Sequence, residues 1–234
     1  MHRRNAQSAR FRSSIFRKLA ALTVSLVVAA TASHAAAQAA GDAHALLERT
    51  PDLFGSTALL VRHSAFDGRW ASVADDRPAL TGAAQQLMQT VRSRPALEQL
   101  QRVNAWVNHA VAYTPDPPGE DNWATLSQTL RTGRGDCEDY AIAKMELLKA
   151  AGVPAQDLYL LIVHDLVKRA DHAILAVQVD GQFWILDLGT DEVLPQRAVH
   201  DYRPIMSFNA GHAWIHGFGG QLDVASVASP VIAR

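Results

Sequence analysis

The sequence predicts an α+β fold in which a helical N-terminal part packs on an antiparallel β-sheet. The chain has 234 residues, of which 48% are hydrophobic and 19% charged, a composition typical of globular proteins. Apart from one early strand, apolar residues recur with helical spacing in the first part of the chain. Short apolar runs bounded by turn residues follow in the second part. Helices and strands that segregate in this way favour an α+β fold over an alternating α/β fold.

Four helices are predicted between residues 82 and 152. The clearest carries Leu97, Leu100, Val103, Val107 and Val111, whose spacing of three and four residues places them on one face. The stretch 113–122 contains three prolines and a glycine, so it is predicted to be a loop. An early strand is expected at 58–62 with a turn at Asp67-Gly68 after it, and the helices are expected at 82–93, 97–111, 123–132 and 137–151.

Three strands are predicted at 158–164, 172–179 and 182–188, and Asp180-Gly181 is a strong two-residue hairpin turn between the last two. In that hairpin Ile174 faces Asp187, so His172 and Asp187 are diagonal neighbours within hydrogen-bond reach. The same face of the hairpin as His172 and Asp187 carries Ile174, Ala176, Phe183 and Ile185. We expect this face to pack against the helix that begins at Cys137.

The N-terminus has the layout of a secretory signal peptide. Six basic residues lie within the first eighteen and are followed by the apolar run 19–32, then by small residues with alanines at 37 and 39. A membrane anchor is the alternative, but this run is shorter than the roughly twenty residues that span a bilayer. We therefore expect a cleaved signal peptide at 1–39 and a single exported domain at 40–234.

The chain beyond its basic leader is acidic, since it keeps 16 of the 22 lysines and arginines and all 23 acidic residues. An acidic surface repels the phosphate backbone, so we expect no nucleic-acid partner.

Cys137 is the only cysteine, so no disulfide can form within the chain. An unpaired thiol in an exported protein is a buried inert group, an intermolecular bridge or a reactive group. Asp136 is a good N-cap with Asp139 three residues later, which places Cys137 in the first helical turn. Backbone amides and the helix dipole there favour a thiolate. His172 and Asp187 would supply the base and the orienting acid that a cysteine nucleophile needs.

Three carboxylates surround this cysteine. Asp136, Glu138 and Asp139 disfavour the thiolate by their charge. An N-cap and an acid that complements the helix dipole account for only two of the three. Oxygen ligands in this number suggest a hard-cation site, with calcium the best fit. The alternative is a solvated helix start. His212 and His216 have a spacing of four, but the glycines around them argue against a zinc-binding helix.

The sequence resembles the bacterial transglutaminase-like cysteine proteinases, the family of the periplasmic LapG proteases. The resemblance extends from about Leu53 to Asn209. It rests on four blocks that stand in this sequence as Trp123-Ala-Thr, Gly135-Asp-Cys-Glu-Asp-Tyr-Ala-Ile-Ala-Lys144, His172-Ala-Ile-Leu with Trp184-Ile-Leu-Asp187, and Tyr202-Arg-Pro-Ile-Met-Ser-Phe-Asn209. Two positions depart from the family pattern, because Leu126 replaces a proline and Leu188 an asparagine.

The resemblance implies a papain-like, transglutaminase-like cysteine protease fold with a catalytic triad of Cys137, His172 and Asp187. It also implies calcium bound through Asp136, Glu138 and Asp139. The implied function is that of a periplasmic endopeptidase that cuts a large surface adhesin near its N-terminus at a small-residue site. The implied inhibitor is a LapD-type inner-membrane receptor for cyclic-di-GMP. An acyltransferase and a non-catalytic calcium-dependent binding module are the alternatives.

Overall fold

The computed structural model describes residues 50–74, 76 and 78–219, and the described residues from Pro51 onward form one compact unit. The predicted signal peptide at 1–39 lies outside the described residues. Within the described part, no helix is both long enough and apolar enough to cross a bilayer.

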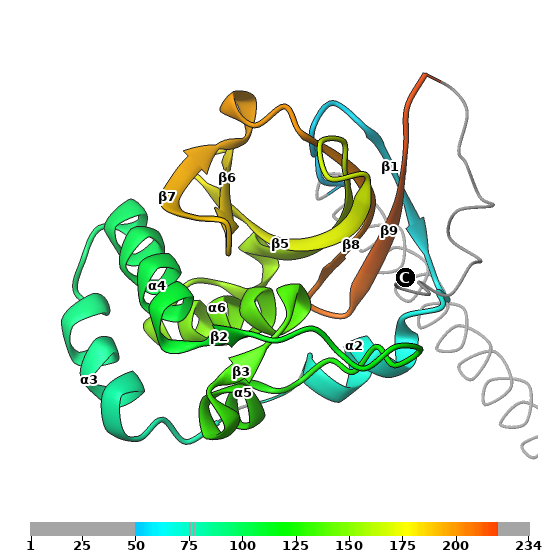
Figure 1. Cartoon of the computed structure of the whole chain (residues 1–234). Helices are drawn as coiled ribbons and strands as arrows, with labels where there is room; N and C mark the ends of the chain where they lie inside the picture. The colour runs from blue at the N-terminus through cyan, green and yellow to red at the C-terminus, as the bar shows by residue number, and fades with distance from the viewer. Residues whose placement is uncertain (1–49, 75, 77, 220–234) are drawn as a thin grey trace, which may run out of the picture. The chain divides into compact units, whose positions relative to one another are not determined.

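The sheet has seven strands in the order β1-β9-β8-β4-β5-β6-β7, and every neighbouring pair is antiparallel. Figure 1 shows that it curls strongly, so that β6 and β7 bend back toward β8. The predicted antiparallel sheet is therefore confirmed. Its strands are β1 (Thr57–Val61), β4 (Leu158–Asp165), β5 (Ala170–Val179), β6 (Gln182–Asp187), β7 (Thr190–Pro195), β8 (Tyr202–Asn209) and β9 (His212–Gly217).

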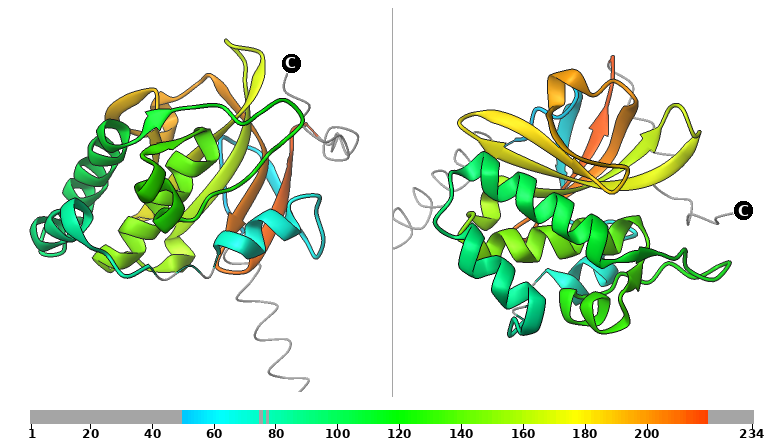
Figure 2. Two further views of the ribbon diagram at one scale, coloured as in Figure 1. Left: turned by 60° about the horizontal axis from the view of Figure 1, so that its bottom comes forward. Right: turned by 60° about the vertical axis from the view of Figure 1, so that its left-hand side comes forward.

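The helices form a layer on one side of this sheet, as the right-hand view of Figure 2 shows. They are α2 (Asp67–Val73), α3 (Gly82–Val91), α4 (Ala96–Ala110), α5 (Leu126–Thr132) and α6 (Cys137–Ala151). A two-stranded parallel pair, β2 (Ala112–Tyr113) and β3 (Arg134–Gly135), joins the loop after α4 to the start of α6. Two 3-10 turns, η1 (Ala155–Asp157) and η2 (Gln196–Ala198), connect later elements.

The turn predicted at Asp67-Gly68 is wrong, because these residues begin helix α2. The Asp67 carboxylate accepts hydrogen bonds from the amide and the hydroxyl of Ser64, at 2.9 and 2.8 Å, and so closes the turn just before the helix. Phe66, the residue before α2, and Val73, the last residue of α2, are buried in the core. Packing therefore overrides the local turn preference of an Asp-Gly pair.

The hairpin β5–β6 has the predicted register, with Val179 opposite Gln182 and Leu175 opposite Leu186. The prediction of which face packs on α6 is wrong. Ala173, Leu175, Val177 and Leu186 share a hydrophobic cluster with α6. The opposite face packs in a second cluster inside the curl of the sheet, and it carries Ile174, Ala176, Phe183 and Ile185. Both faces are apolar, so alternation along the strands cannot distinguish them.

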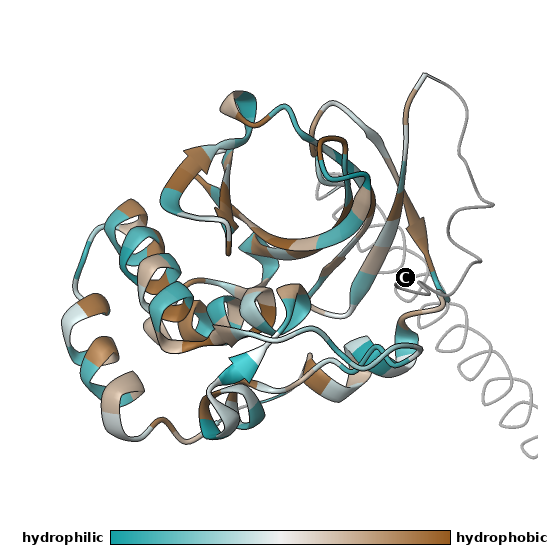
Figure 3. Cartoon of the chain, in the orientation of Figure 1, coloured by the Kyte–Doolittle hydropathy of each residue, from teal (hydrophilic) through white to brown (hydrophobic). Residues whose placement is uncertain are grey.

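Hydrophobic residues occupy both layers, and Figure 3 shows α4 alternating between hydrophobic and hydrophilic residues along its length. Helix α6 differs, because eleven of its fifteen residues are buried, including Lys144 and Glu146. A central helix with this burial holds its first turn rigidly against strand β5. The amino end of α6 is therefore a well-supported position for chemistry.

Candidate active site

Cys137 is the first residue of α6, and its helix start is built by the residues around it. Asp136 is the N-cap in extended conformation, and it exchanges hydrogen bonds with Asp139 in a capping box, as the sequence predicts. A Cβ atom on Gly135 would lie 2.6 Å from the Cβ of Asp139, so only glycine fits beside the capping side chain. Gly135, Asp136 and Asp139 together therefore fix the position of the thiol.

The Cys137 side chain is half-buried, and its thiol donates a hydrogen bond to Glu138 Oε2 at 3.0 Å. Burial raises the pKa of the thiol, and the charge of Glu138 and its hydrogen bond to the thiol raise it further. A hydrogen bond from the backbone amide of Ala173 lowers the pKa of the thiol. The sulfur therefore lies against strand β5, one residue from His172. The thiol is thus protonated and held by its neighbour.

His172 and Asp187 meet as the hairpin register predicts, with His172 Nε2 3.1 Å from Asp187 Oδ1. Both side chains are buried. Burial alone would raise the pKa of Asp187, but His172, Tyr202 and the Gly189 amide lower it well below its usual range. Because ionised Asp187 only accepts hydrogen bonds, Nε2 carries a proton and Nδ1 is the nitrogen left for a reacting group.

In the part of the chain that the structure describes, no hydrogen bond joins Cys137 to His172. The sulfur lies against the backbone amide of Ala173, the residue after His172, but the thiol donates its hydrogen bond to Glu138. Catalytic hydrogen bonds in ligand-free enzymes are often absent or long and tighten when substrate binds.

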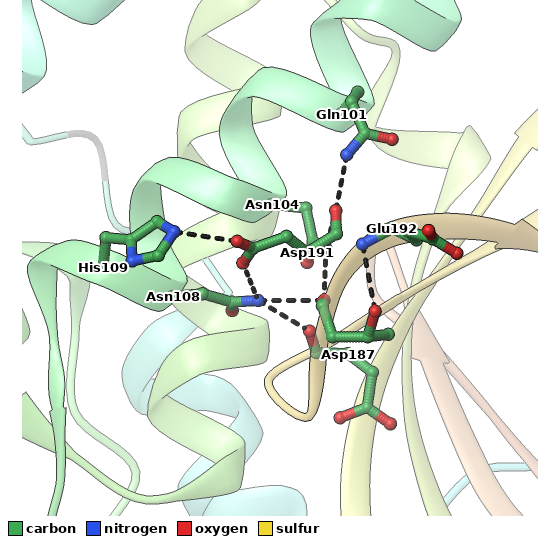
Figure 4. A network of polar contacts seen from close by, with 8 residues as sticks. Gln101, Asn104, Asn108, His109, Asp187, Asp191 and Glu192 are labelled. Carbon is green, nitrogen blue, oxygen red and sulfur yellow. Dashed lines mark hydrogen bonds and ion pairs between the residues drawn. The ribbon is translucent and has the colours of Figure 1, made fainter.

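The turn after Asp187 is attached to helix α4 by side-chain amides. Asn108 Nδ2 donates to the backbone carbonyl of Asp187 at 3.1 Å and to that of Thr190 at 3.0 Å. Gln101 and Asn104 bind the carbonyl of Asp191. Figure 4 shows this network, in which the Asp187 carbonyl faces α4 while its carboxylate points away from the helix. The polar face of α4 therefore anchors the backbone of the acid.

Lys144 is a residue of this region that the sequence analysis did not single out. It is only 1% exposed, and its ammonium group lies 5.8 Å from the centre of the Tyr140 ring. Burial lowers the pKa of Lys144 to about 7, against the opposing effect of the charges on Asp187 and Asp191. Lys144 lies two helical turns after Cys137, and a lysine among apolar residues in the centre of the helix is the signal that would have identified it.

The three predicted metal ligands belong to the N-cap and the first turn of α6. Burial and the Asp136 charge raise the pKa of Glu138 to about 8, and burial raises that of Asp139 to about 6. Asp116 and Asp121, from the loop before α5, add to this negative charge. Asp136 Oδ1 is buried without a hydrogen-bond partner. The cluster is therefore short of positive charge.

The carboxylate of Asp139 is already engaged, because Oδ1 accepts from the Ala124 amide at 2.7 Å and Oδ2 from the Asp136 amide at 3.3 Å. Across residues 50–74, 76 and 78–219, no three side chains of His, Cys, Asp or Glu converge as a bound metal requires. Asp136 and Glu138 interact directly through their carboxyl groups. These two form the open part of the acidic cluster.

His212 and His216 lie on strand β9, which agrees with the argument against a zinc-binding helix. His216 is buried between two serines, with Nδ1 2.7 Å from Ser56 Oγ and Nε2 2.8 Å from Ser207 Oγ. Both of its ring nitrogens therefore have structural partners.

Comparison with known proteins agrees with this geometry. LapG of Legionella pneumophila matches with 31% identity and a TM-score of 0.53 over 57% of this chain and 74% of that chain. Its structures in calcium-bound and EGTA-treated form each match with 30% identity and a TM-score of 0.54. The UPF0252 protein PH0672 of Pyrococcus horikoshii is 32% identical over 84 residues, which are 36% of this chain and only 25% of that protein.

The family model described as bacterial transglutaminase-like cysteine proteinase, BTLCP, matches residues 70–216, more than half of the chain. The matched range includes Cys137, His172 and Asp187. The mixed fold of helices on an antiparallel sheet agrees with the papain-like, transglutaminase-like architecture that the resemblance implies. The chain belongs to the bacterial transglutaminase-like cysteine proteinases.

Proposed function

We propose that the protein is a calcium-dependent endopeptidase that uses Cys137 as nucleophile, His172 as general base and acid, and Asp187 as the residue that orients the imidazole. The observation that carries this proposal is the buried His172–Asp187 hydrogen bond next to the Cys137 sulfur, which lies against the Ala173 amide. A nucleophile, a base and an orienter in this order are the parts that covalent peptide hydrolysis requires.

The reaction follows from the atoms available. His172 Nδ1 accepts the thiol proton, the sulfur attacks a peptide carbonyl carbon, and the same proton goes to the leaving amine. Water then hydrolyses the acyl-enzyme. The Cys137 amide at the amino end of α6 has no partner within the helix and would stabilise the oxyanion. For the first transfer the thiol must leave Glu138 and turn toward His172.

The acidic cluster fits a hard cation. It offers only oxygen ligands, has a buried acceptor without a partner on Asp136, and raises the pKa of its own carboxyl groups. Asp136 and Glu138 would hold calcium together with Asp139, whose oxygens each keep a lone pair beside their amide bonds. A bound calcium ion would supply the positive charge that this helix start lacks. The calcium-bound form of the Legionella protein supports the proposal.

The proposed substrate is the N-terminal region of a large surface adhesin, cut at a small-residue site such as an alanine pair so that cells leave a biofilm. The proposed location is the periplasm, reached through the signal peptide at 1–39, and the proposed inhibitor is a LapD-type cyclic-di-GMP receptor. Family membership and the basic, then apolar, N-terminus support these proposals.

Mass spectrometry of an adhesin fragment incubated with wild-type protein and with Cys137→Ala tests nucleophile, reaction and substrate class together. Two untagged fragments are expected with the wild type and none with the variant. Cleavage by Cys137→Ala would remove the nucleophile assignment. An amine donor included in the mixture distinguishes the acyltransferase, because transfer would attach the amine to the product. Calcium binding with no product of either kind would favour the binding module.

A further inference from the structure

The carboxylate of Asp187 is held by more than His172. Its Oδ1 accepts from His172 Nε2 at 3.1 Å and from the Gly189 amide at 2.9 Å, and its Oδ2 accepts from the Tyr202 hydroxyl at 2.5 Å. The Tyr202 and His172 rings are 5.7 Å apart, inclined at 49°. One tyrosine therefore contacts both members of the His172–Asp187 pair.

Tyr202 reaches this pair across the curl of the sheet. It is the first residue of β8, where it pairs with Asp165 of β4, and β4 and β5 lie between β8 and β6 in the strand order. Only the strong curvature visible in Figure 1 brings a β8 side chain to the end of β6. The contact between Tyr202 and Asp187 thus depends on the tertiary shape of the sheet.

The contact between Asp187 and Tyr202 borders a cavity. This cavity has a volume of about 340 Å³ and is lined by both residues together with Ile185, Leu194 and Val199 among others. Beside a cavity, shape complementarity alone does not fix the rotation of a carboxylate. A hydrogen bond to Oδ2 does fix it, and the Tyr202 hydroxyl is the side chain that supplies one.

We propose that Tyr202 is a positioning residue of the proposed catalytic triad, whose hydroxyl sets the rotation of the Asp187 carboxylate and whose ring confines the His172 imidazole. This inference rests on the proposed function. The buried Tyr140 behaves differently, because it donates to the backbone carbonyl of Val111. The hydroxyl of Tyr202 is directed at the acid itself. It adds a charge-assisted hydrogen bond to a buried carboxylate, the strong class of such bonds.

Tyr202→Phe tests the proposal because it keeps the ring and removes the hydroxyl. We expect kcat for the adhesin fragment to fall about tenfold, the equivalent of one lost hydrogen bond of about 1.4 kcal/mol, with KM unchanged. In 15N-histidine NMR spectra, His172 of the wild type should be a single tautomer protonated at Nε2. In the variant that proton should exchange faster, and a second tautomer should appear.

Tyr159→Phe is the matched control, since Tyr159 lies on the same concave face and its ring packs against Phe183 and Trp214. It should leave kcat and the His172 spectrum unchanged. Equal kcat in Tyr202→Phe and wild type, or an equal loss in both variants, would overturn the proposal.

The NMR measurement separates this inference from the proposed function. If the wild type cuts no fragment, the proposed function fails, but an unchanged His172 tautomer in Tyr202→Phe is still the result that refutes the role of Tyr202. If Tyr202→Phe does not fold, the wild type decides: a slowly exchanging Tyr202 hydroxyl proton is expected, and rapid exchange refutes the proposal.

Discussion

The two ends of the proposed triad differ in how the fold satisfies their charges. At the acid end, Asp187 accepts three hydrogen bonds from fixed donors, and its pKa is lowered in spite of burial. At the thiol end, Cys137 is bound to a carboxyl group, Asp136 has a buried oxygen without a partner, and the pKa values of the thiol and of Glu138 are raised. One end is electrostatically complete, whereas the other is not.

This difference shows which part of the site folding alone supplies. The donors to Asp187 come from strands β5 and β8 and from a turn anchored on α4, so they form whenever the sheet and helix pack. Within the described residues, the acids beside Cys137 find the thiol, backbone amides and one another, and no positive charge among these contacts. A ligand that brings positive charge would complete the thiol end. Activity should therefore depend on structure at one end and on a cation at the other.

Asp187→Asn breaks the complete end and should have the largest effect. An asparagine side chain is neutral, and its amide N–H donates where a carboxylate oxygen accepts. The Nε2–H group of His172 then loses its acceptor, so the tautomer protonated at Nε2 is no longer favoured. In a Ser-His-Asp triad the same change costs about 10⁴-fold in kcat, and a loss of at least about 10³-fold is expected here.

The matched control for that change is Asp171→Asn. Asp171 lies on the same strand as His172 and pairs with His164 at 3.0 Å, but this pair is exposed to solvent. Its kcat should stay within about twofold of the wild type, as is usual for exposed ion pairs. An Asp187→Asn variant that folds and keeps a tenth of the activity would contradict the assigned role.

Removal of calcium tests the incomplete end. Excess EGTA should lower cleavage of the adhesin fragment by about 100-fold, and added calcium should restore it, because uncompensated carboxylates disfavour the thiolate. Binding can be measured without activity, since a ligand that binds only the folded state raises Tm. Calcium should raise the Tm of the wild type and of Glu98→Gln, a distant acid on α4, but not that of Asp136→Asn. Full activity in excess EGTA would refute the metal assignment.

Gly135→Ala disturbs the thiol end through geometry. The new Cβ atom would lie 2.6 Å from the Cβ and Oδ2 atoms of Asp139, so the capping side chain must shift. We expect a loss of about 2 kcal/mol in the free energy of unfolding, as for overpacked sites, and about tenfold lower kcat.

Gly68→Ala is the matched glycine for this test. It lies within helix α2, and no atom lies within 4 Å of its added Cβ. It should leave activity unchanged and stabilise the protein slightly, because alanine has the higher helix propensity. Urea unfolding of both variants makes the comparison, and equal stability of the two would contradict the steric argument.

The sequence predicted the acid end better than the sheet that surrounds it. The Asp180-Gly181 turn determines a register, and a register places His172 beside Asp187 without knowledge of the rest of the fold. Strands β7, β8 and β9 were not predicted as strands. Pro195 and Pro204 interrupt the strand pattern there, and glycines surround β9. The sequence therefore names Tyr202 only as part of a family block and does not predict its contact with Asp187, which exists only in the curled sheet.

The thiol end was predicted from local rules, since capping and the helix dipole act within one turn. Local rules do not predict contacts between residues that are far apart in the sequence. The approach of Ala173 to the thiol, the burial of Lys144 and the second contact of Asp139 at Ala124 all come from tertiary packing. The wrong face assigned to the β5–β6 hairpin has the same cause, because two apolar faces are equivalent in sequence.

His216 differs from both ends of the triad, because it is buried and hydrogen-bonded at both ring nitrogens but uncharged. Its replacement should have the smallest effect on activity. Ser56 Oγ donates to the Leu53 carbonyl and therefore accepts from His216 Nδ1, which leaves Nε2 to accept from Ser207. Burial lowers the pKa of His216 to about 4, below the ordinary value of 6.5. Between these two values the unfolded chain binds the proton and the folded protein does not, so stability falls as the pH falls through this range. The full effect is about 3 kcal/mol, and none of it is lost above pH 6.5.

His216→Gln cannot titrate, so the stability advantage of the wild type over this variant in urea should be largest at pH 7.5 and shrink toward pH 4. Cleavage of the adhesin fragment at pH 7.5 should be the same for both proteins. A stability difference that stays constant from pH 7.5 to pH 4 would show that His216 does not titrate as its burial requires.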